Sequence, residues 1–334
     1  MTPQALDRFV SLNWEEAPPA AFIAQLERAL TASDDQLDFP MLDRARLLNA
    51  AYKTADLKPD FPIAGRATVR VFESQLRTAL AVRPRTIQTS AGGLTDLTLT
   101  DLAIVWCGDD AKIEQFLDFS LHTLGKRPSR LIKLLAEPRR PPWAAQGAWY
   151  APCTSGRGRR STSSVGVDGA ATLEVANGFD ELGAKLGELD STLIYTIGLP
   201  IIPAKTLARI NCPIFNLHNG ALPWIRGLDS PAWSLVSGAP PAVTLHAVAP
   251  GVDTGEIVAN ELVGSAAEKP RKADFESAKR RLWRRTFALT KTGGVAVHGA
   301  FHRIHPSHGP DEVASGTLFY AMHPKLRSIL DRMV

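Results

Sequence analysis

The 334-residue chain is poor in cysteine, and its three cysteines stand far apart in the sequence. Cys107, Cys153 and Cys212 form no C-x-x-C pair, and their number is odd. A disulfide framework needs paired cysteines, and a structural zinc site needs closely spaced ligands. The cysteines therefore indicate neither of these, and they fit a reducing compartment.

Long apolar segments are also missing. No run approaches the roughly 18 uninterrupted apolar residues that a membrane-spanning helix needs. The N-terminus, MTPQALDRFVSLNWEE, has no basic segment followed by an apolar one, so it is unlike a secretory signal peptide. We expect a soluble, cytoplasmic protein with no membrane partner.

Two common nucleotide-binding motifs are absent too. The segment SGRGRRS at 155–161 is rich in glycine, but it follows no expected strand and lacks the Lys-Ser/Thr ending of a phosphate-binding loop. No G-x-G-x-x-G follows the first expected strand of the core. The sequence therefore does not support a nicotinamide cofactor.

The net charge of +4 is small for this length, but its distribution is uneven. Residues 266–291 hold nine Lys or Arg against three acids, with a possible buried stripe of Phe275, Leu282, Phe287 and Leu289. We interpret this stretch as a solvated helix face. The alternatives are contact with a phosphate-bearing substrate or tRNA, although we do not expect a nucleic-acid partner.

The pattern of apolar residues along the sequence changes near residue 99. Before residue 99, apolar residues follow helical spacing between proline-containing joints, and we identify no functional motif in this region. After it, short apolar runs alternate with helical patterns, which is typical of a parallel sheet with crossover helices. We predict an α/β fold with a Rossmann-like, mostly parallel sheet, and three regions: a mainly helical N-terminal extension (1–98), a core (99–265) and a short C-terminal helical and irregular region (266–334).

Strands are expected in the core at seven places, with helices between several of them. A connection over 138–168, rich in Pro, Gly, Ser and Arg, is expected to be mobile. The expected strands are 101–108, 130–137, 171–176, 191–198, 212–218, 241–248 and 256–263, and the expected helices are 109–124, 179–189, 200–210 and 229–238.

The stretch FNLHNGALPWIRG, residues 215–227, carries the main functional signal. Asn216 and His218 stand at the carboxyl end of an expected strand and point to the same side, because side chains alternate along a strand. Ligands of open α/β sheets bind at that edge. We expect Asp253, in the turn PGVDTG, to lie on another loop of the same sheet.

These three residue types suit acyl transfer to an amine. Such a reaction needs a base for the amine proton, a hydrogen-bond donor for the oxyanion and a group that orients the base. His218, Asn216 and Asp253 can fill these roles in that order. The alternatives are that His218 is a histidine satisfied by the backbone and that Asp253 only caps its turn.

The frame around these residues makes the signal specific. N-x-H at 216–218, L-P at 222–223, R-G at 226–227, T-x-H at 244–246 and G-x-D-T-G-E-I at 251–257 together resemble the folate-dependent formyltransferase family. The resemblance covers about residues 99–263 and is specific from 192 to 263. It implies that Asn216, His218 and Asp253 are catalytic and that 10-formyltetrahydrofolate is the formyl donor.

The same resemblance implies a folate pocket made by two loops. One precedes the N-x-H strand, and the other ends at the catalytic Asp. Apolar side chains there suit a pterin ring, and backbone amides can bind its polar edge. The implied residues are Leu199, Pro200 and Ile202 in the first loop, and Val248, Pro250, Gly251 and Val252 in the second.

The acceptor is less clearly indicated. Gly220, Ala221, Leu222 and Pro223 after the histidine resemble the amino-sugar branch, so we expect a small amine, an amino sugar or sugar nucleotide. Another small amine such as hydroxyornithine, and methionyl-tRNA, are alternatives. Two further readings are a formyltetrahydrofolate hydrolase and a non-catalytic RNA-binding protein that uses 269–291. A homodimer is possible.

A histidine cluster near the C-terminus is a candidate metal site. His298 and His302 are four residues apart and would share a helix face, with His305 and His308 nearby. The cluster has no acidic or cysteine ligand at a familiar spacing. We therefore expect solvated histidines and no metal.

Overall fold

The structure is a computed structural model that describes residues 41–57, 86–89, 97–108, 124–135, 172–237, 239–263, 270–299, 302–305, 318–319 and 324–331, with single positions at 24, 70, 74, 113, 116, 117 and 322. The helices predicted before residue 41 and the connection predicted to be mobile over 138–168 lie outside these residues. Among the described helices, none has the length and apolarity needed to cross a membrane.

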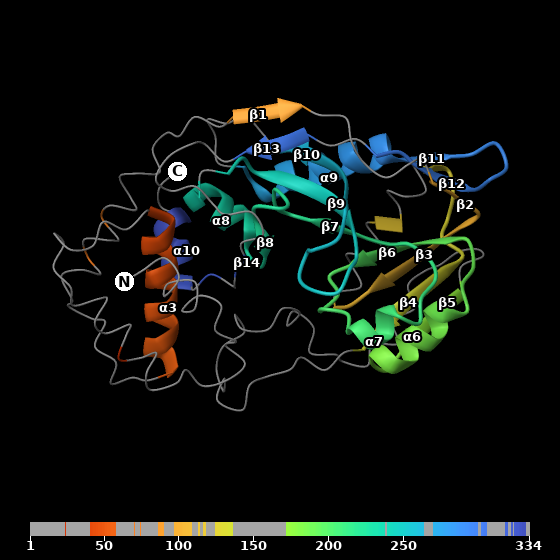
Figure 1. Ribbon diagram of the computed structural model, residues 1–334, viewed down its shortest axis with the longest axis horizontal. Helices are drawn as coiled ribbons and strands as arrows, with labels where there is room; N and C mark the ends of the chain where they lie inside the picture. Colours follow the sequence, from red (N-terminus) through yellow and green to blue (C-terminus); the bar gives the residue numbers. More distant parts are fainter. Residues whose placement is uncertain are drawn as a thin grey trace.

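A seven-stranded sheet forms the centre of the molecule (Figure 1). Only one strand, β9, runs against the others, because it pairs antiparallel with both of its neighbours, β10 and β7. From one edge to the other the strands are β10 (Ile257–Leu262), β9 (Ala242–Ala247), β7 (Ile214–His218), β6 (Thr192–Ile197), β3 (Asp101–Trp106), β4 (Arg130–Leu134) and β5 (Thr172–Ala176).

The chain enters this sheet in the middle. The first strand is β3, and β4 and β5 follow on one side of it. The chain then crosses to the other side of β3, where it forms β6 and β7. The helices α6 (Phe179–Gly187) and α7 (Ala204–Leu207) follow β5 and β6. This is the strand order of a Rossmann-like sheet, so the prediction of an α/β fold with a mostly parallel sheet is confirmed.

Both faces of the sheet are buried, which is why its central strands read as apolar runs. One face packs against the helix α9 (Lys272–Thr286), and its core includes Trp106, Tyr195, Phe215, Leu282 and Trp283. The other face packs against α6, and its core includes Val105, Ile194, Ile214, Leu182 and Leu186.

The basic stretch forms α9 and the strand β11 (Phe287–Leu289). Phe275, Leu282 and Phe287 are buried, but Leu289 is 48% exposed. The expectation that Leu289 belongs to the buried stripe is therefore wrong, because the helix ends at Thr286 and helical spacing no longer applies. On the polar side, Arg281 and Arg285 pair with Glu261 of β10 at 2.9 and 3.1 Å.

The segments outside the central sheet pair across the predicted regions. The small strands β11 and β2 (Leu97–Leu99) flank β12 (Val295–Val297), and β1 (Thr86–Thr89) pairs with β13 (His302–His305). The boundaries at 98 and 265 stay a prediction, but these pairings join residues from beyond both of them.

The histidine cluster does not form a helical pair. His302 and His305 lie on β13, which is a strand, and His298 precedes it outside any helix. The premise that His298 and His302 share a helix face is therefore wrong. His308 lies outside the described residues, and within the described ones no group of three His, Cys, Asp or Glu side chains could hold a metal ion.

A second group of helices lies at the end of the molecule opposite α6 and α7 (Figure 1). The helix α3 (Met41–Leu57) contacts α8 (Ser230–Ser237) and α10 (Pro324–Asp331). The short strand β14 (Leu318–Phe319) pairs in parallel with β8 (Arg226–Gly227), just before α8. The described segments nearest both ends of the chain therefore meet beside the loop that follows β7.

Candidate active site

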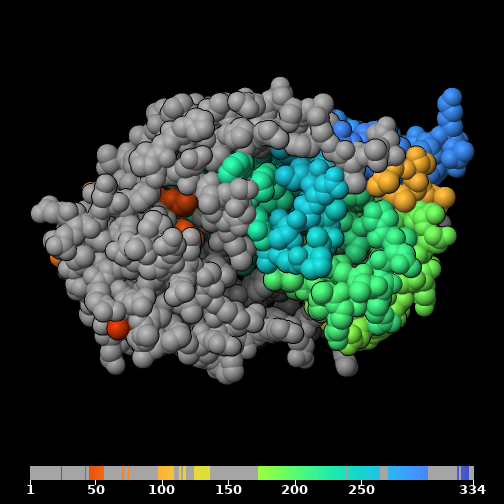
Figure 2. Space-filling model, viewed as in Figure 1, coloured from red at the N-terminus to blue at the C-terminus, as the bar shows by residue number. Residues whose placement is uncertain are grey.

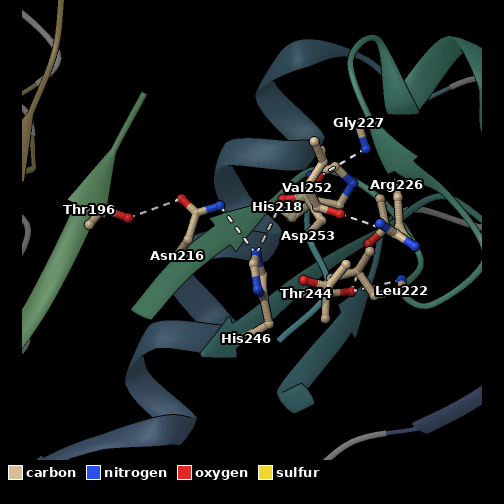
Figure 3. Close-up of polar contacts among 12 residues, drawn as sticks. Thr196, Asn216, His218, Leu222, Arg226, Gly227, Thr244, His246, Val252 and Asp253 are labelled. Atoms are coloured by element: carbon tan, nitrogen blue, oxygen red, sulfur yellow. Dashed lines mark hydrogen bonds and ion pairs between the residues drawn. The ribbon is translucent and has the colours of Figure 1, made fainter. Parts of the chain in front are cut away.

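Three polar side chains form a row across neighbouring strands of the sheet. The register places Thr196 of β6 beside Asn216 of β7, and Asn216 opposite His246 of β9 (Figure 3). Residues in register share a face of a sheet, so the three side chains lie on one side. The row lies on the face that carries Ile194 and Ile214.

The amide of Asn216 is held at both ends. Its Oδ1 lies 3.4 Å from the hydroxyl of Thr196, and its Nδ2 lies 3.3 Å from Nε2 of His246. Because an amide nitrogen carries two hydrogens, one N–H of Asn216 is left to bind a further acceptor. A fixed N–H at a strand end is the kind of donor that stabilises an oxyanion.

His218 is the last residue of β7, and its side chain is 8% exposed. Its Nε2 lies 2.8 Å from the carbonyl oxygen of Ile225 and 3.1 Å from the hydroxyl of Ser230. A carbonyl oxygen only accepts, so Nε2 carries a hydrogen. In the neutral ring the lone pair is then on Nδ1, which lies 3.3 Å from Oδ2 of Asp253.

Gly220 is required for this placement of the imidazole. A Cβ at position 220 would lie 2.5 Å from Nε2 of His218 and 2.6 Å from the carbonyl oxygen of Ile225. Both distances are too short for any side chain. The G in the sequence HNGALP therefore leaves room for the ring of His218 and its carbonyl partner.

Asp253 reaches the row from the turn between β9 and β10, which lies at the surface (cyan in Figure 2). Its backbone is left-handed, with a φ of 48°, a conformation that Asp tolerates better than most residues. Its Oδ2 accepts the backbone N–H of Gly227 at 2.9 Å, and its Oδ1 lies 3.5 Å from Nε2 of His246. The carboxylate therefore joins both histidines.

The surroundings favour an ionised carboxylate at Asp253 and a neutral imidazole at His218. Burial disfavours the carboxylate of Asp253, but hydrogen bonds and charge from His246, His218 and the N–H of Gly227 outweigh it and lower its pKa to about 2. Burial lowers the pKa of His218, and the charge of Asp253 opposes this without cancelling it. A neutral imidazole beside an ionised carboxylate can take a proton and gain an ion pair.

The turn that carries Asp253 is fastened to the loop after β7. The Nε of Arg226 donates to the carbonyl oxygen of Val252 at 2.8 Å, and Thr254 donates to that of Pro250 at 2.9 Å. Thr244 of β9 donates to the carbonyl oxygen of Gly220 at 2.7 Å. The R-G and T-x-H parts of the sequence frame thus hold the loops between which His218 and Asp253 meet.

The residues predicted to bind folate lie on the two expected loops. Leu199 and Val248 are both partly buried against the apolar cluster on the α6 face, and Ile202 is buried. Pro200 and Val252 are partly exposed, while Pro250 and Gly251 are exposed at the turn. The donor-binding role of these seven residues stays a prediction.

Three contacts of the cluster were not assigned a role from the sequence: His246, Thr196 and Ser230. His246 and Thr244 appeared only as part of the T-x-H frame. The signal that identifies His246 and Thr196 is the strand register, because residues in register with Asn216 share its face. Ser230 lies on α8 and has no such signal. The sequence pattern predicted β6, β7 and β9 but gave no register between them.

No protein-family model matches the sequence. Among solved structures, the chain is similar to a sugar N-formyltransferase from Shewanella sp. with 12% identity, a TM-score of 0.39, and coverage of 56% of this chain and 68% of that one. For a phosphoribosylglycinamide formyltransferase from Anaplasma phagocytophilum the corresponding values are 18%, 0.39, 60% and 96%.

A third similar structure is a formyltransferase from Anoxybacillus kamchatkensis in complex with UDP-4,6-dideoxy-4-formamido-L-AltNAc and tetrahydrofolate. The identity is 22%, the TM-score is 0.28, and the match covers 49% of this chain and 61% of that one. More than a third of that chain therefore has no matched residue here. All three of these solved structures are formyltransferases.

Proposed function

We propose that this protein is an N-formyltransferase that moves a formyl group from 10-formyltetrahydrofolate to an amine. The observation that carries the proposal lies at the carboxyl end of β7, where Asp253 contacts His218 directly and is joined to Asn216 through His246. Their sequence frame resembles the folate-dependent formyltransferases, from which the identity of the donor is taken. The arrangement of these side chains suits acyl transfer independently of that resemblance.

In the proposed reaction the neutral amine attacks the formyl carbon of the donor. A bond forms between the amine nitrogen and this carbon, and the electron pair of the carbonyl double bond moves onto its oxygen. The free N–H of Asn216 donates to that oxyanion, which is the charge that develops in the transition state. When the carbonyl re-forms, the bond to N10 breaks, and N10 takes a proton to give tetrahydrofolate.

The proton that the amine loses can be accepted by His218. Nδ1 of His218 holds a lone pair when neutral, and it faces the ionised carboxylate of Asp253 at 3.3 Å. A proton that reaches this pair, directly or through a water molecule, is stabilised by the carboxylate. Asp253 thus offsets the charge of the imidazole once it is protonated, and the ion pair then orients the ring, while Ile225 and Ser230 fix the hydrogen on Nε2.

An amino sugar, in nucleotide-linked form or free, is the proposed acceptor. The run Gly220-Ala221-Leu222-Pro223 supports this through its resemblance to the amino-sugar branch. Hydroxyornithine-like amines and methionyl-tRNA are the other acceptors to test. A screen of these amines with 10-formyltetrahydrofolate, which measures tetrahydrofolate production, identifies the acceptor.

Asn216→Ala tests the catalytic assignment. Because loss of one oxyanion donor costs about 2.7–4 kcal/mol of barrier, kcat should fall by roughly 10²- to 10³-fold. The matched control is Asn177→Ala, because Asn177 is exposed and bonds only to Glu181 in α6 among the contacts of the described residues. An unchanged kcat in Asn216→Ala would refute the role.

The same assay separates the alternatives. Formate release without an acceptor would indicate a formyltetrahydrofolate hydrolase with the same three residues. RNA affinity that falls steeply with salt, together with an absence of folate binding, would indicate an RNA-binding protein.

A further inference from the structure

His246 takes no part in the mechanism proposed above, yet it touches two of the groups that do. Its side chain is 4% exposed, and its Nε2 lies 3.3 Å from Nδ2 of Asn216 and 3.5 Å from Oδ1 of Asp253. Figure 3 shows the ring below the amide of Asn216 and facing it. A buried polar ring in this position constrains its neighbours.

The other ring nitrogen fixes the tautomer of His246. Nδ1 lies 2.8 Å from the carbonyl oxygen of Ala247. Because a carbonyl oxygen can only accept, Nδ1 carries the hydrogen. The neutral ring therefore has its lone pair on Nε2, and this atom accepts an N–H from Asn216.

Nothing else in the row decides which way round the amide of Asn216 lies. The hydroxyl of Thr196 can donate to an amide oxygen or accept from an amide nitrogen, so it suits both orientations. Its hydrogen also has a second acceptor, the carbonyl oxygen of Phe215 at 3.1 Å. Only His246 discriminates, because in the neutral ring with its hydrogen on Nδ1, Nε2 accepts and does not donate.

We propose that His246 is a positioning residue that orients the amide of Asn216 so that an N–H, and not the carbonyl oxygen, faces the reacting carbonyl. The catalytic meaning of this inference rests on the proposed function. With His246 in its Nδ1–H form, Nδ2 of Asn216 is drawn towards the ring and its second N–H stays available for the oxyanion. A reversed amide would present an oxygen to the developing negative charge and repel it.

Two substitutions that keep a polar side chain separate this role from simple packing. His246→Gln can place an amide oxygen where Nε2 stands, so it retains an acceptor for Asn216. His246→Asn reaches only to the position of Nδ1. We expect His246→Gln to keep kcat within about threefold of the wild type, and His246→Asn to lose about tenfold or more with KM changed less than about twofold.

A double-mutant cycle shows whether His246 acts through Asn216. In the background of Asn216→Ala, His246→Asn should reduce kcat little further, because there is no amide left to orient. A full additional loss in that background would contradict the inference, as would a wild-type kcat in His246→Asn alone.

An NMR measurement tests the orientation without any turnover. Long-range proton–nitrogen spectra of the imidazoles, with His246 assigned by its loss in His246→Gln, should show the Nδ1–H tautomer. The Nε2–H tautomer would overturn the inference even in an active enzyme. The Nδ1–H tautomer in a protein that transfers no formyl group would instead remove the proposed function and leave the amide orientation standing.

Discussion

At the scale of single residues, the ionised carboxylate of Asp253 in the candidate active site also stabilises the fold. Its pKa falls from 3.8 to about 2, because the contacts with His246 of β9 and His218 of β7 and the N–H of Gly227 of β8 outweigh the cost of burial. A carboxyl whose pKa is lower in the folded state stabilises the fold above the pKa of the unfolded chain. That stability is lost as the pH falls from about 4 to about 2.

Asp253→Asn should therefore abolish one part of the acid dependence of stability. The free energy of unfolding of the wild type should exceed that of the variant by about 2 kcal/mol more at pH 5 than at pH 2. Chemical denaturation across this range measures the difference. A constant difference would mean that Asp253 is not specially stabilised in its charged form.

The catalytic residues were predicted from residue type and spacing, together with the resemblance of their frame to the folate-dependent formyltransferases. Asn216 and His218 could be placed at one edge because alternation along a strand is fixed by geometry. Their hydrogen-bond partners could not be placed. The carbonyl of Ile225 and the hydroxyl of Ser230 reach His218 only because the loop after β7 folds back, and no local pattern predicts such a return.

At the scale of elements, the turn between β9 and β10 packs so closely against β9 that it leaves no room for a side chain at Gly255. A Cβ at Gly255 would lie 1.6 Å from the carbonyl oxygen of Ala247, so any side chain there must push the turn away from β9. Asp253 belongs to the same turn and would move with it.

Gly255→Ala should consequently impair activity beyond its effect on stability. We expect a cost of about 1–3 kcal/mol in the free energy of unfolding and a fall in kcat of about tenfold or more. The control is Gly183→Ala in α6, where the added Cβ would lie 3.2 Å from a methyl of Thr206, away from the cluster. A wild-type kcat in Gly255→Ala would show that the turn is not needed in this position.

Most of the seven strands of the central sheet were predictable because they are short apolar runs between turn residues. Their lateral order and register were not. The pairing of β9 with β7, which places His246 against Asn216, depends on contacts between segments about thirty residues apart. The end of α9 was missed for a related reason, since the pairing of β11 with β12 takes over where the helix stops.

At the scale of the whole molecule, segments near both ends of the described chain converge on Asp229, at the start of α8. Its Oδ2 accepts the backbone N–H of Met322 at 2.7 Å, and its Oδ1 pairs with Arg327 of α10. Lys53 of α3 is buried near it. Burial lowers the pKa of Lys53 to about 7, against the opposing charge of Asp229.

Because Lys53 is buried, we predict that the free energy of unfolding rises in weakly alkaline solution. Lys53 loses its proton at a lower pH in the folded chain than in the unfolded one, so between about pH 7 and 10.5 the unfolded state binds more protons. Unfolding free energy should then increase with pH, by at most about 1.4 kcal/mol per unit.

Lys53→Met removes this titration and should flatten the rise between pH 7.5 and 9, as measured by chemical denaturation. Equal slopes in the variant and the wild type would contradict the burial of a titrating ammonium. No sequence pattern indicated this convergence, and residues 1–98 were predicted only as a mainly helical N-terminal extension.

The central claim is that the cluster of Asn216, His218 and Asp253 transfers a formyl group to an amine. The most direct measurement follows the labelled carbon of 10-formyltetrahydrofolate in the presence of candidate amines, using mass spectrometry of the products. We predict that the label appears as a formamide of one acceptor with the wild type, and that Asp253→Asn slows its appearance by about 10²-fold or more. Label that appears only as formate, or equal rates in both proteins, would contradict the account.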